Sequence, residues 1–439
     1  MMGKPQSVEP KLFYTGVNLA DRIPPNHPLR LIKETIPFSL VRNRVANCYG
    51  CNGHESLDPA LILKLLFLLF YQNVRSEREL MRQLPYRMDW LWFCDLDLDD
   101  SIPDHSVLSK ARRRWGLEVF EGLFAEVLSL CAESGLIDGR TVYADSTVLK
   151  ADASVDSRIP RCLWEQMEKS LVESDEQDSQ DDGPPRSRPA PPEDTQSDDL
   201  PQPPQGKFNT HTVSRTDPDS ATTRRPGRGV VLGYRDHCLV DDRYGVVTAT
   251  IATAADYDDA ALLQPLLEKQ KKYISSAPDR VVGDSSYGTC ANYEFLRGEG
   301  IKGYLKLRRG SNGRGNWLEK ITEHSSAAMA IKLMRRRLHT AEGRFAEAHV
   351  RYDHRRCRWR RRWRVQIQCY LVAIVQNIGK LLRYGRWPGQ AGSRFAEIFR
   401  PFCLIDRVFR AIPSALSAGR RRFLPIKPPQ PIPSFVNPR

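Results

Sequence analysis

The hydrophobic period of the chain changes near Arg140. Before that point, residues 10–136 carry apolar side chains at the three- and four-residue spacing of helices, most clearly over residues 117–134. From Arg140 onward the spacing shortens towards the two-residue period of a β-strand that ends at Asp145. The change predicts a helical N-terminal domain over residues 10–136, followed by a domain that contains a sheet.

The second domain is expected over residues 137–390, where strand and helix patterns alternate. This alternation predicts an α/β (α+β) fold in which helices cover a mixed sheet. The expected strands are two around the turn at 241–245, then 280–283 and 302–307, and the expected helices are 258–272, 293–299, 326–350 and 364–385.

Two segments have the composition of disordered chain. Residues 170–207 are predicted to be a disordered acidic insertion, because 173–205 hold ten acidic residues, many prolines and no aromatic residue. The insertion is either a spacer or a mimic of DNA charge that occupies a basic groove. Residues 391–439 are predicted to be a C-terminal extension with a proline-rich tail, since 421–439 hold six prolines.

The formal net charge of +13 and the pI near 9.3 favour a polyanionic partner. Residues 351–364 concentrate eight arginines and two tryptophans. The residues expected there to contact double-stranded DNA are Arg358, Arg360, Arg361 and Arg362. Trp359 and Trp363 lie four residues apart on an expected helix, so they either stack on a displaced base or pack inside the protein.

A second basic group lies in the N-terminal domain, on an expected helix over residues 107–114. Its basic residues are Lys110, Arg112, Arg113 and Arg114. Two helices joined by a short polar connection, with the second one basic, are typical of DNA-binding helical pairs. The alternative is a solvated basic face of an amphipathic helix.

Cysteine usage and hydropathy predict a cytoplasmic protein without membrane association. Ten cysteines are scattered through the chain and no signal peptide is evident, so we expect reduced thiols. Cys48, Cys51 and His54 lack a second ligand pair for zinc and are predicted to be turn residues. The apolar run over residues 60–71 is too short to span a bilayer and is predicted to be a buried helix.

Three acidic residues stand where a catalytic metal site needs them. Asp145 and Asp284 each end an apolar run, and Glu342 opens a helical stretch. Carboxylates at two strand ends, facing one on a helix, can hold Mg²⁺ ions beside a phosphodiester, because Mg²⁺ prefers hard oxygen ligands. Glu347 is the alternative to Glu342, but it lies on a different side of a helix.

The chain resembles the DDE transposases of bacterial insertion sequences, in the group with a helical N-terminal domain before an RNase H-like catalytic core. The resemblance spans roughly residues 10–390. In the first domain it rests on Asn26-His-Pro-Leu-Arg30, Leu57-Asp-Pro59, Arg75-Ser-Glu-Arg-Glu79 and Ile102-Pro-Asp-His-Ser106. In the core it rests on Asp145-Ser-Thr147, Lys150-Ala-Asp-Ala-Ser154, Thr216-Asp-Pro-Asp219, Leu232-Gly-Tyr-Arg-Asp-His237, Asp284 with Tyr287-Gly288, Glu342 with Phe345, Arg364-Val-Gln-Ile-Gln368 and Gln376-Asn377.

The resemblance implies that Asp145, Asp284 and Glu342 bind two Mg²⁺ ions, with Mn²⁺ as a substitute. Water would attack each transposon end, and the freed 3′-hydroxyl would then attack target DNA. The implied partners are terminal inverted repeats, target DNA and a second copy of the chain, which together form a synaptic homodimer associated with the nucleoid. The rival functions are a catalytically impaired remnant that acts as a DNA-binding repressor, and a Mg²⁺-dependent nuclease without strand transfer.

Further residues of the resembling segments are expected to contact DNA. Arg235 and His237 are predicted to bind phosphate or, alternatively, to pack a hairpin. Arg337 is predicted to clamp phosphate, since guanidinium groups bind it bidentately. Two positions depart from the family pattern: His349 stands where relatives usually carry lysine, and Arg361 stands where they usually carry glycine.

Overall fold

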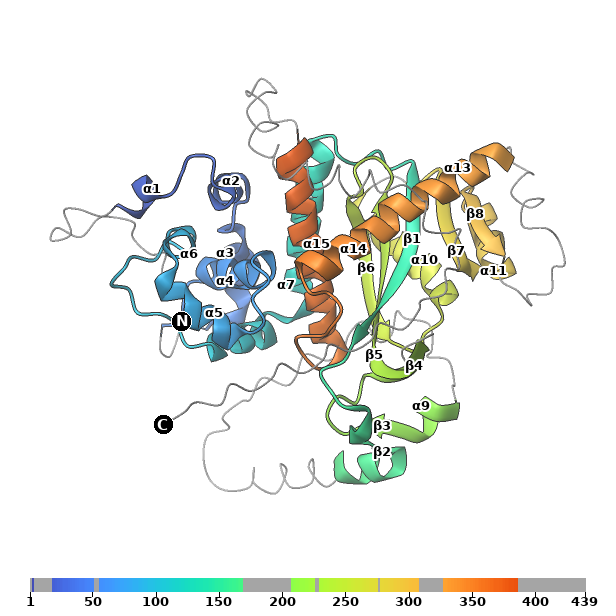
Figure 1. Cartoon of the computed structure of the whole chain (residues 1–439), viewed down its shortest axis with the longest axis horizontal. Helices are drawn as coiled ribbons and strands as arrows, with labels where there is room; N and C mark the ends of the chain where they lie inside the picture. Colours follow the sequence, from blue (N-terminus) through green and yellow to red (C-terminus); the bar gives the residue numbers. More distant parts are fainter. Residues whose placement is uncertain are drawn as a thin grey trace, which may run out of the picture. The chain divides into compact units, whose positions relative to one another are not determined.

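The computed structural model describes residues 2–3, 18–50, 55–168, 207–225, 229–274, 277–307 and 327–385 (Figure 1). The predicted acidic insertion apart from Lys207, the C-terminal extension, Cys51 and His54 lie outside these residues. The N-terminal helices are α1 (Leu19–Arg22), α2 (Pro28–Thr35), α3 (Leu40–Val45), η1 (Ala46–Cys48), α4 (Pro59–Tyr71), α5 (Glu77–Gln83), η2 (Leu84–Tyr86), α6 (Met88–Phe93) and α7 (Ser106–Glu133).

The starts of two N-terminal helices confirm the capping patterns in the sequence. The Asp58 carboxylate accepts a hydrogen bond from the Ala60 amide, and Pro59 occupies the first turn of α4. The Ser76 hydroxyl likewise accepts from the Glu79 amide at the start of α5. Helix α4 is buried on every side, as its apolar composition predicts.

The second region is built on a six-stranded mixed sheet. Strand β1 pairs antiparallel with β5, and β5 pairs antiparallel with both β4 and β6. On its other side β1 pairs parallel with β7, which pairs parallel with β8. This arrangement confirms the expected RNase H-like core. The strands are β1 (Thr141–Lys150), β4 (Ala221–Arg225), β5 (Gly229–Asp241), β6 (Val247–Ala254), β7 (Arg280–Gly288) and β8 (Lys302–Leu307); β2 (Arg158–Pro160) and β3 (Thr212–Ser214) form a separate pair near α9 (Lys207–His211), and η3 (Val155–Ser157) precedes β2.

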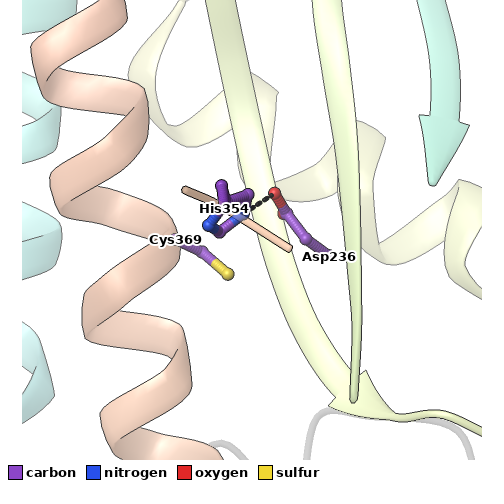
Figure 2. A group of neighbouring side chains, drawn as sticks. All are labelled: Asp236, His354 and Cys369. Carbon is purple, nitrogen blue, oxygen red and sulfur yellow. Dashed lines mark hydrogen bonds and ion pairs between the residues drawn. The ribbon is translucent and has the colours of Figure 1, made fainter. Parts of the chain in front are cut away.

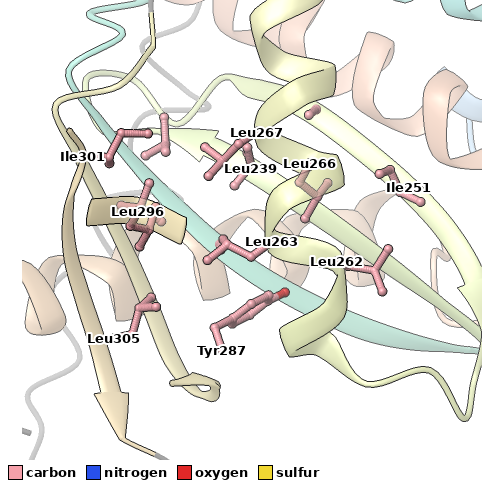
Figure 3. Close-up of a cluster of buried hydrophobic side chains, with 14 residues drawn as sticks. Leu239, Ile251, Leu262, Leu263, Leu266, Leu267, Tyr287, Leu296, Ile301 and Leu305 are labelled. Atoms are coloured by element: carbon pink, nitrogen blue, oxygen red, sulfur yellow. The ribbon is translucent and has the colours of Figure 1, made fainter. Parts of the chain in front are cut away.

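Helices cover both faces of the sheet. One face packs against η5 (Asp259–Leu262), α10 (Leu263–Tyr273) and α11 (Cys290–Gly298), and Figure 3 shows Leu239, Leu263 and Leu296 in its core. The strand residues Val142, Ala144 and Val281 belong to the same core. The opposite face carries Tyr143 and Val282 and packs against α13 (Ala327–Arg337) and η6 (Leu338–Glu342), which are followed by α14 (Gly343–Arg351) and α15 (Arg362–Tyr384). Because side chains alternate along a strand, the odd-numbered residues of β1 face α13 to α15.

The helical rod that crosses this second face is not a regular α-helix (Figure 1). The sequence predicts one helix over residues 326–350, whereas Leu338–Glu342 form a π-helical turn between α13 and α14. Such turns insert one residue into an α-helix and occur often at functional sites. The prediction that Trp359 and Trp363 share a helix is wrong, because α15 begins at Arg362.

Helix α15 is long and apolar enough to cross a membrane, but 89% of its most apolar window is buried inside the protein. It packs against α7 and α4 of the N-terminal region and against β6 of the sheet. It is therefore the central helix of a packed core. The division of the chain between residues 136 and 137 stays a prediction, since these contacts cross it. The eight cysteines in the described ranges are free thiols.

Candidate active site

Asp145 and Asp284 occupy equivalent positions on neighbouring parallel strands. The β1–β7 register pairs Thr141 with Arg280 and Tyr143 with Val282, and each acid lies two residues further along its strand. Both carboxylates therefore lie on the sheet face that α13 covers. The expectation that they end their strands is wrong, because β1 continues to Lys150 and β7 to Gly288. What ends just before the acids is the pairing between the two strands.

Glu342 reaches the same place from the π-helical turn. The Arg337 guanidinium donates hydrogen bonds to Asp145 Oδ2 at 3.0 Å and to Glu342 Oε1 at 3.3 Å. The Arg337 side chain is only 10% exposed, whereas that of Glu342 is 54% exposed. One buried cation thus joins two acids that are almost 200 residues apart in the sequence.

The pKa of Asp145 reports on all three acids. Burial raises this pKa, and the negative charges of Asp284 and Glu342 raise it further, while the Arg337 guanidinium lowers it. The net result is a pKa of about 6. Burial is the largest cause of this shift, and the charges of Asp284 and Glu342 contribute to it because both carboxylates lie near Asp145. The structure therefore brings the three sequence-predicted acids to one location.

An open pocket of about 390 Å³ adjoins the acids. Arg337 and Asp284 lie in its wall, so the guanidinium that joins the carboxylates also faces an accessible space. Its other lining residues are Ser285, Lys306, Ile331, Met334, Arg335 and Leu338. Three cationic side chains in this wall favour an anionic ligand.

His349 lies on the same face as the acids. Its Nε2 is 3.2 Å from the hydroxyl of Thr147, which follows Asp145 by two residues on β1. Glu347 is directed elsewhere, because it accepts a hydrogen bond from Gln376 of α15 and pairs with Arg351. This geometry favours Glu342 over Glu347 as the third acid.

A buried polar cluster next to the acids was not predicted from the sequence. Asp236, His354 and Cys369 have ligand atoms within 4.8 Å of one another (Figure 2). Asp236 also accepts hydrogen bonds from Thr250 at 2.6 Å and from Arg344 at 3.0 Å, and from His354 at 2.9 Å. The only signals in the sequence are an acid inside an apolar strand and a histidine among arginines.

The charges of this cluster are balanced within the protein. Burial alone would raise the pKa of Asp236, but Arg344 and His354 hold it well below its usual range. Burial raises the pKa of the Cys369 thiol far above its usual value, so the thiol stays protonated. Because Arg344 already supplies the positive charge, the cluster fits an internal ion-pair network better than a metal centre.

Two predicted DNA contacts lie on the wrong face of the sheet. Arg235 and His237 alternate with Asp236 along β5, so they point away from the three acids. Arg235 donates to Asp259 at 2.8 Å, and His237, which is fully buried, lies 3.2 Å from the same carboxylate. These contacts favour packing of the hairpin over phosphate binding for both residues.

Two further arginines hold the N-terminal helices to the core. Arg112 is 3% exposed, pairs with Glu77, and stacks over the Trp359 ring at 3.9 Å. Arg358 donates to the backbone oxygens of Leu69 and Val74. Arg112 is buried away from DNA in this conformation, and the half-buried Arg358 is already engaged by these backbone oxygens. The contact of Trp359 with Arg112 places that tryptophan in packing.

The other predicted DNA contacts have surface positions. Lys110, Arg113 and Arg114 are exposed on α7. Arg360 pairs with Asp152 and Arg361 pairs with Asp219, both at partly exposed positions. Arg361 has φ +76° and ψ 138°, a conformation that favours glycine. This backbone geometry suits the glycine that the family resemblance implies at this position.

Comparisons with known proteins identify two families along the chain. Residues 17–114 match the model of a transposase domain, DUF772, and residues 208–378 match the model of the transposase DDE domain. No curated protein and no solved structure matches the chain. The family implies a nucleic-acid-processing enzyme that binds DNA and uses a divalent metal. The two matches cover the helical region and much of the sheet, and together they support an insertion-sequence DDE transposase.

Proposed function

We propose that this transposase cleaves the ends of its element and joins the resulting 3′-hydroxyl to target DNA at Asp145, Asp284 and Glu342. The observation that carries the proposal is the convergence of these acids on one side of the sheet, with Arg337 joining two of them. Their carboxylate oxygens fit Mg²⁺, or Mn²⁺ as a substitute, because both prefer oxygen ligands.

When bound, two such ions would activate the attacking oxygen and stabilise the leaving oxygen. The chain's own residues supply the positioning. Arg337 lines the open pocket and can bind the phosphate in a bidentate manner. His349, held near Thr147, can donate to a phosphate oxygen, though less strongly than lysine at neutral pH.

We propose that DNA reaches the site along exposed and half-exposed basic residues of two regions. These residues are Lys110, Arg113, Arg114, Arg360, Arg361 and Arg362. Each arginine that neutralises a phosphate releases counterions, so binding should weaken steeply as salt rises. Neutralising Arg360, Arg361 and Arg362 together should lower the affinity and flatten the salt slope, measured by fluorescence anisotropy. An unchanged slope would move the DNA path elsewhere.

The catalytic assignment is tested with a DNA fragment that carries the element's own terminal inverted repeats. Asp145→Asn and Glu342→Gln should each abolish metal-dependent cleavage while DNA affinity stays similar or rises. Glu347→Gln is the matched control, because Glu347 contacts Gln376 and Arg351 and should keep its cleavage activity. Cleavage by either of the first two variants would refute the assignment.

The same assay separates the rival functions. A DNA-binding repressor remnant would bind the repeats without nicking them in Mg²⁺ or Mn²⁺. A nuclease would release cleaved ends without joined products. We expect joined products, formed by a homodimer that holds two transposon ends. We also propose that the protein is cytoplasmic and associated with the nucleoid.

A further inference from the structure

Arg337 contacts the acids themselves, and phosphate binding alone does not explain these contacts. It is nearly buried, yet it donates to two of the three carboxylates that would bind metal. A guanidinium cation and a divalent cation compete for the same oxygens. The side chain therefore cannot keep both contacts when the site is loaded.

The carboxylates are already engaged. Asp145 Oδ2 accepts from Arg337, and Asp145 Oδ1 accepts from the Ser146 amide at 2.9 Å. Asp284 Oδ1 accepts from the Ser286 amide at 2.8 Å. Among these bonds, only the Arg337 contacts bring a formal positive charge to the acids, so they are the ones that a metal ion must displace.

The contacts of Arg337 are arranged for release. Its bond to Glu342 is the longer of the two, and the Glu342 side chain is more than half exposed, where water weakens an ion pair. Arg337 also lines the open pocket with Lys306 and Arg335. A freed guanidinium therefore has a space next to it that an anion can enter.

We propose that Arg337 is a resident counter-charge of the carboxylates, which metal displaces from Asp145 and Glu342 and which then positions the DNA phosphate in the adjoining pocket. The inference rests on the proposed function. It assigns Arg337 two successive partners, first the acids and then the phosphate, and it couples metal binding to DNA positioning.

Mn²⁺ binding to the full chain without DNA tests the proposal, with the free ion followed by electron paramagnetic resonance. Arg337→Gln should bind Mn²⁺ about tenfold tighter than the parent chain, because one nearby opposite charge shifts a carboxyl pKa by one or more units. Arg336→Gln is the control, since that neighbouring arginine pairs with Asp242 instead. It should change the affinity less than twofold.

Equal or weaker Mn²⁺ binding by Arg337→Gln would overturn the inference. If that variant does not fold, judged by circular dichroism, Arg337→Lys serves in its place. A lysine keeps the charge but cannot fork between two carboxylates, so we expect affinity between those of the parent and the glutamine variant.

A second measurement separates this inference from the proposed function. Asp145→Asn should weaken Mn²⁺ binding whatever Arg337 does, and unchanged binding would count against the proposed metal site itself. Arg337→Gln should also bind the terminal-repeat DNA less tightly in Ca²⁺, which permits assembly without turnover. Tighter Mn²⁺ binding with unchanged DNA affinity would overturn the second half of the inference.

Discussion

Asp145 and Asp236 are close neighbours on one face of the same sheet, yet their surroundings shift the pKa of the two carboxyl groups in opposite directions. In the β1–β5 register Asp145 pairs with Cys238, and Asp236 pairs with Thr147. Asp236 is fully buried and accepts from an arginine, a histidine and a threonine. Asp145 shares one arginine with Glu342 and has two other acids nearby.

Whether a buried carboxylate can accept a metal ion therefore depends more on the cationic hydrogen-bond donors around it than on its burial. The pKa of Asp236 is lowered and that of Asp145 is raised, although burial pushes both upward. Asp236 already has its counter-charge inside the fold. The negative charge of Asp145 and its two acidic neighbours exceeds the positive charge near them. Such an excess of negative charge favours the binding of a cation.

The largest expected effect is loss of stability on changing Asp236. Asp236→Asn should lower the free energy of unfolding by about 3–5 kcal/mol, because it leaves the buried Arg344 guanidinium without its counter-charge. Urea unfolding followed by circular dichroism measures the change. The double variant with Arg344→Met should be less destabilised than the single variant, and additive losses would contradict the ion-pair reading.

The second prediction concerns acid. Asp236 has a folded-state pKa below its unfolded value of roughly 3.9, so its stabilisation is complete above that value and is lost as pH falls below about 4. His354 acts in the same direction from about pH 6.5 downward, because burial lowers its pKa despite Asp236. Melting temperatures from pH 7 to pH 3 should fall less steeply for the Asp236→Asn, Arg344→Met double variant.

Asp145 should affect stability with the opposite dependence on pH from Asp236. The pKa of Asp145 rises from 3.8 to about 6 on folding, so its contribution to stability falls as pH rises through that window. At pH 7 without divalent metal, Asp145→Asn should therefore raise the free energy of unfolding by about 1–3 kcal/mol. A destabilised variant, measured in chelator, would remove the contrast with Asp236.

The smallest effect is expected for a change of Arg361, whose backbone amide binds the buried carboxylate of Asp217. Asp217 is fully buried and accepts from the Tyr234 hydroxyl at 2.6 Å and from the Arg361 backbone amide at 2.9 Å. Arg361→Gly keeps that amide, relieves the positive φ and loses a partly exposed ion pair with Asp219. We expect stabilisation of at most about 1 kcal/mol in thermal unfolding, and a loss above that size would show that the side chain matters more than its backbone.

The sequence was sufficient for features set by local chemistry. The caps of α4 and α5, the buried helix over 60–71 and the strand–helix alternation follow from residue type and spacing within a few positions. The sequence also predicts three acids from their local patterns, and these acids lie near one another in the fold, while their catalytic role stays a prediction. The positions of Asp145 and Asp284 within their strands could not be predicted, because strand length depends on pairing partners that are distant in the chain.

Features that depend on distant partners could not be predicted. The two-residue period of a strand predicts that Arg235 and Asp236 face opposite sides of the sheet. Only the β1–β5 register shows which of the two shares a face with Asp145. The sequence does not distinguish an arginine buried against Glu77 from one exposed to solvent, so it predicts DNA contact for Arg112, which the fold buries. The cluster of Asp236, His354 and Cys369 joins positions more than 100 residues apart.

The π-helical turn has a consequence for how relatives of this chain are compared. Arg337 and Glu342 are five residues apart and still share one side of the rod, because the turn absorbs one extra residue. A relative with a regular α-helix would present the same pair at a spacing of four. An alignment that insists on constant spacing would then discard a true equivalent, so an arginine–acid pair should be matched by its three-dimensional direction and not by its count.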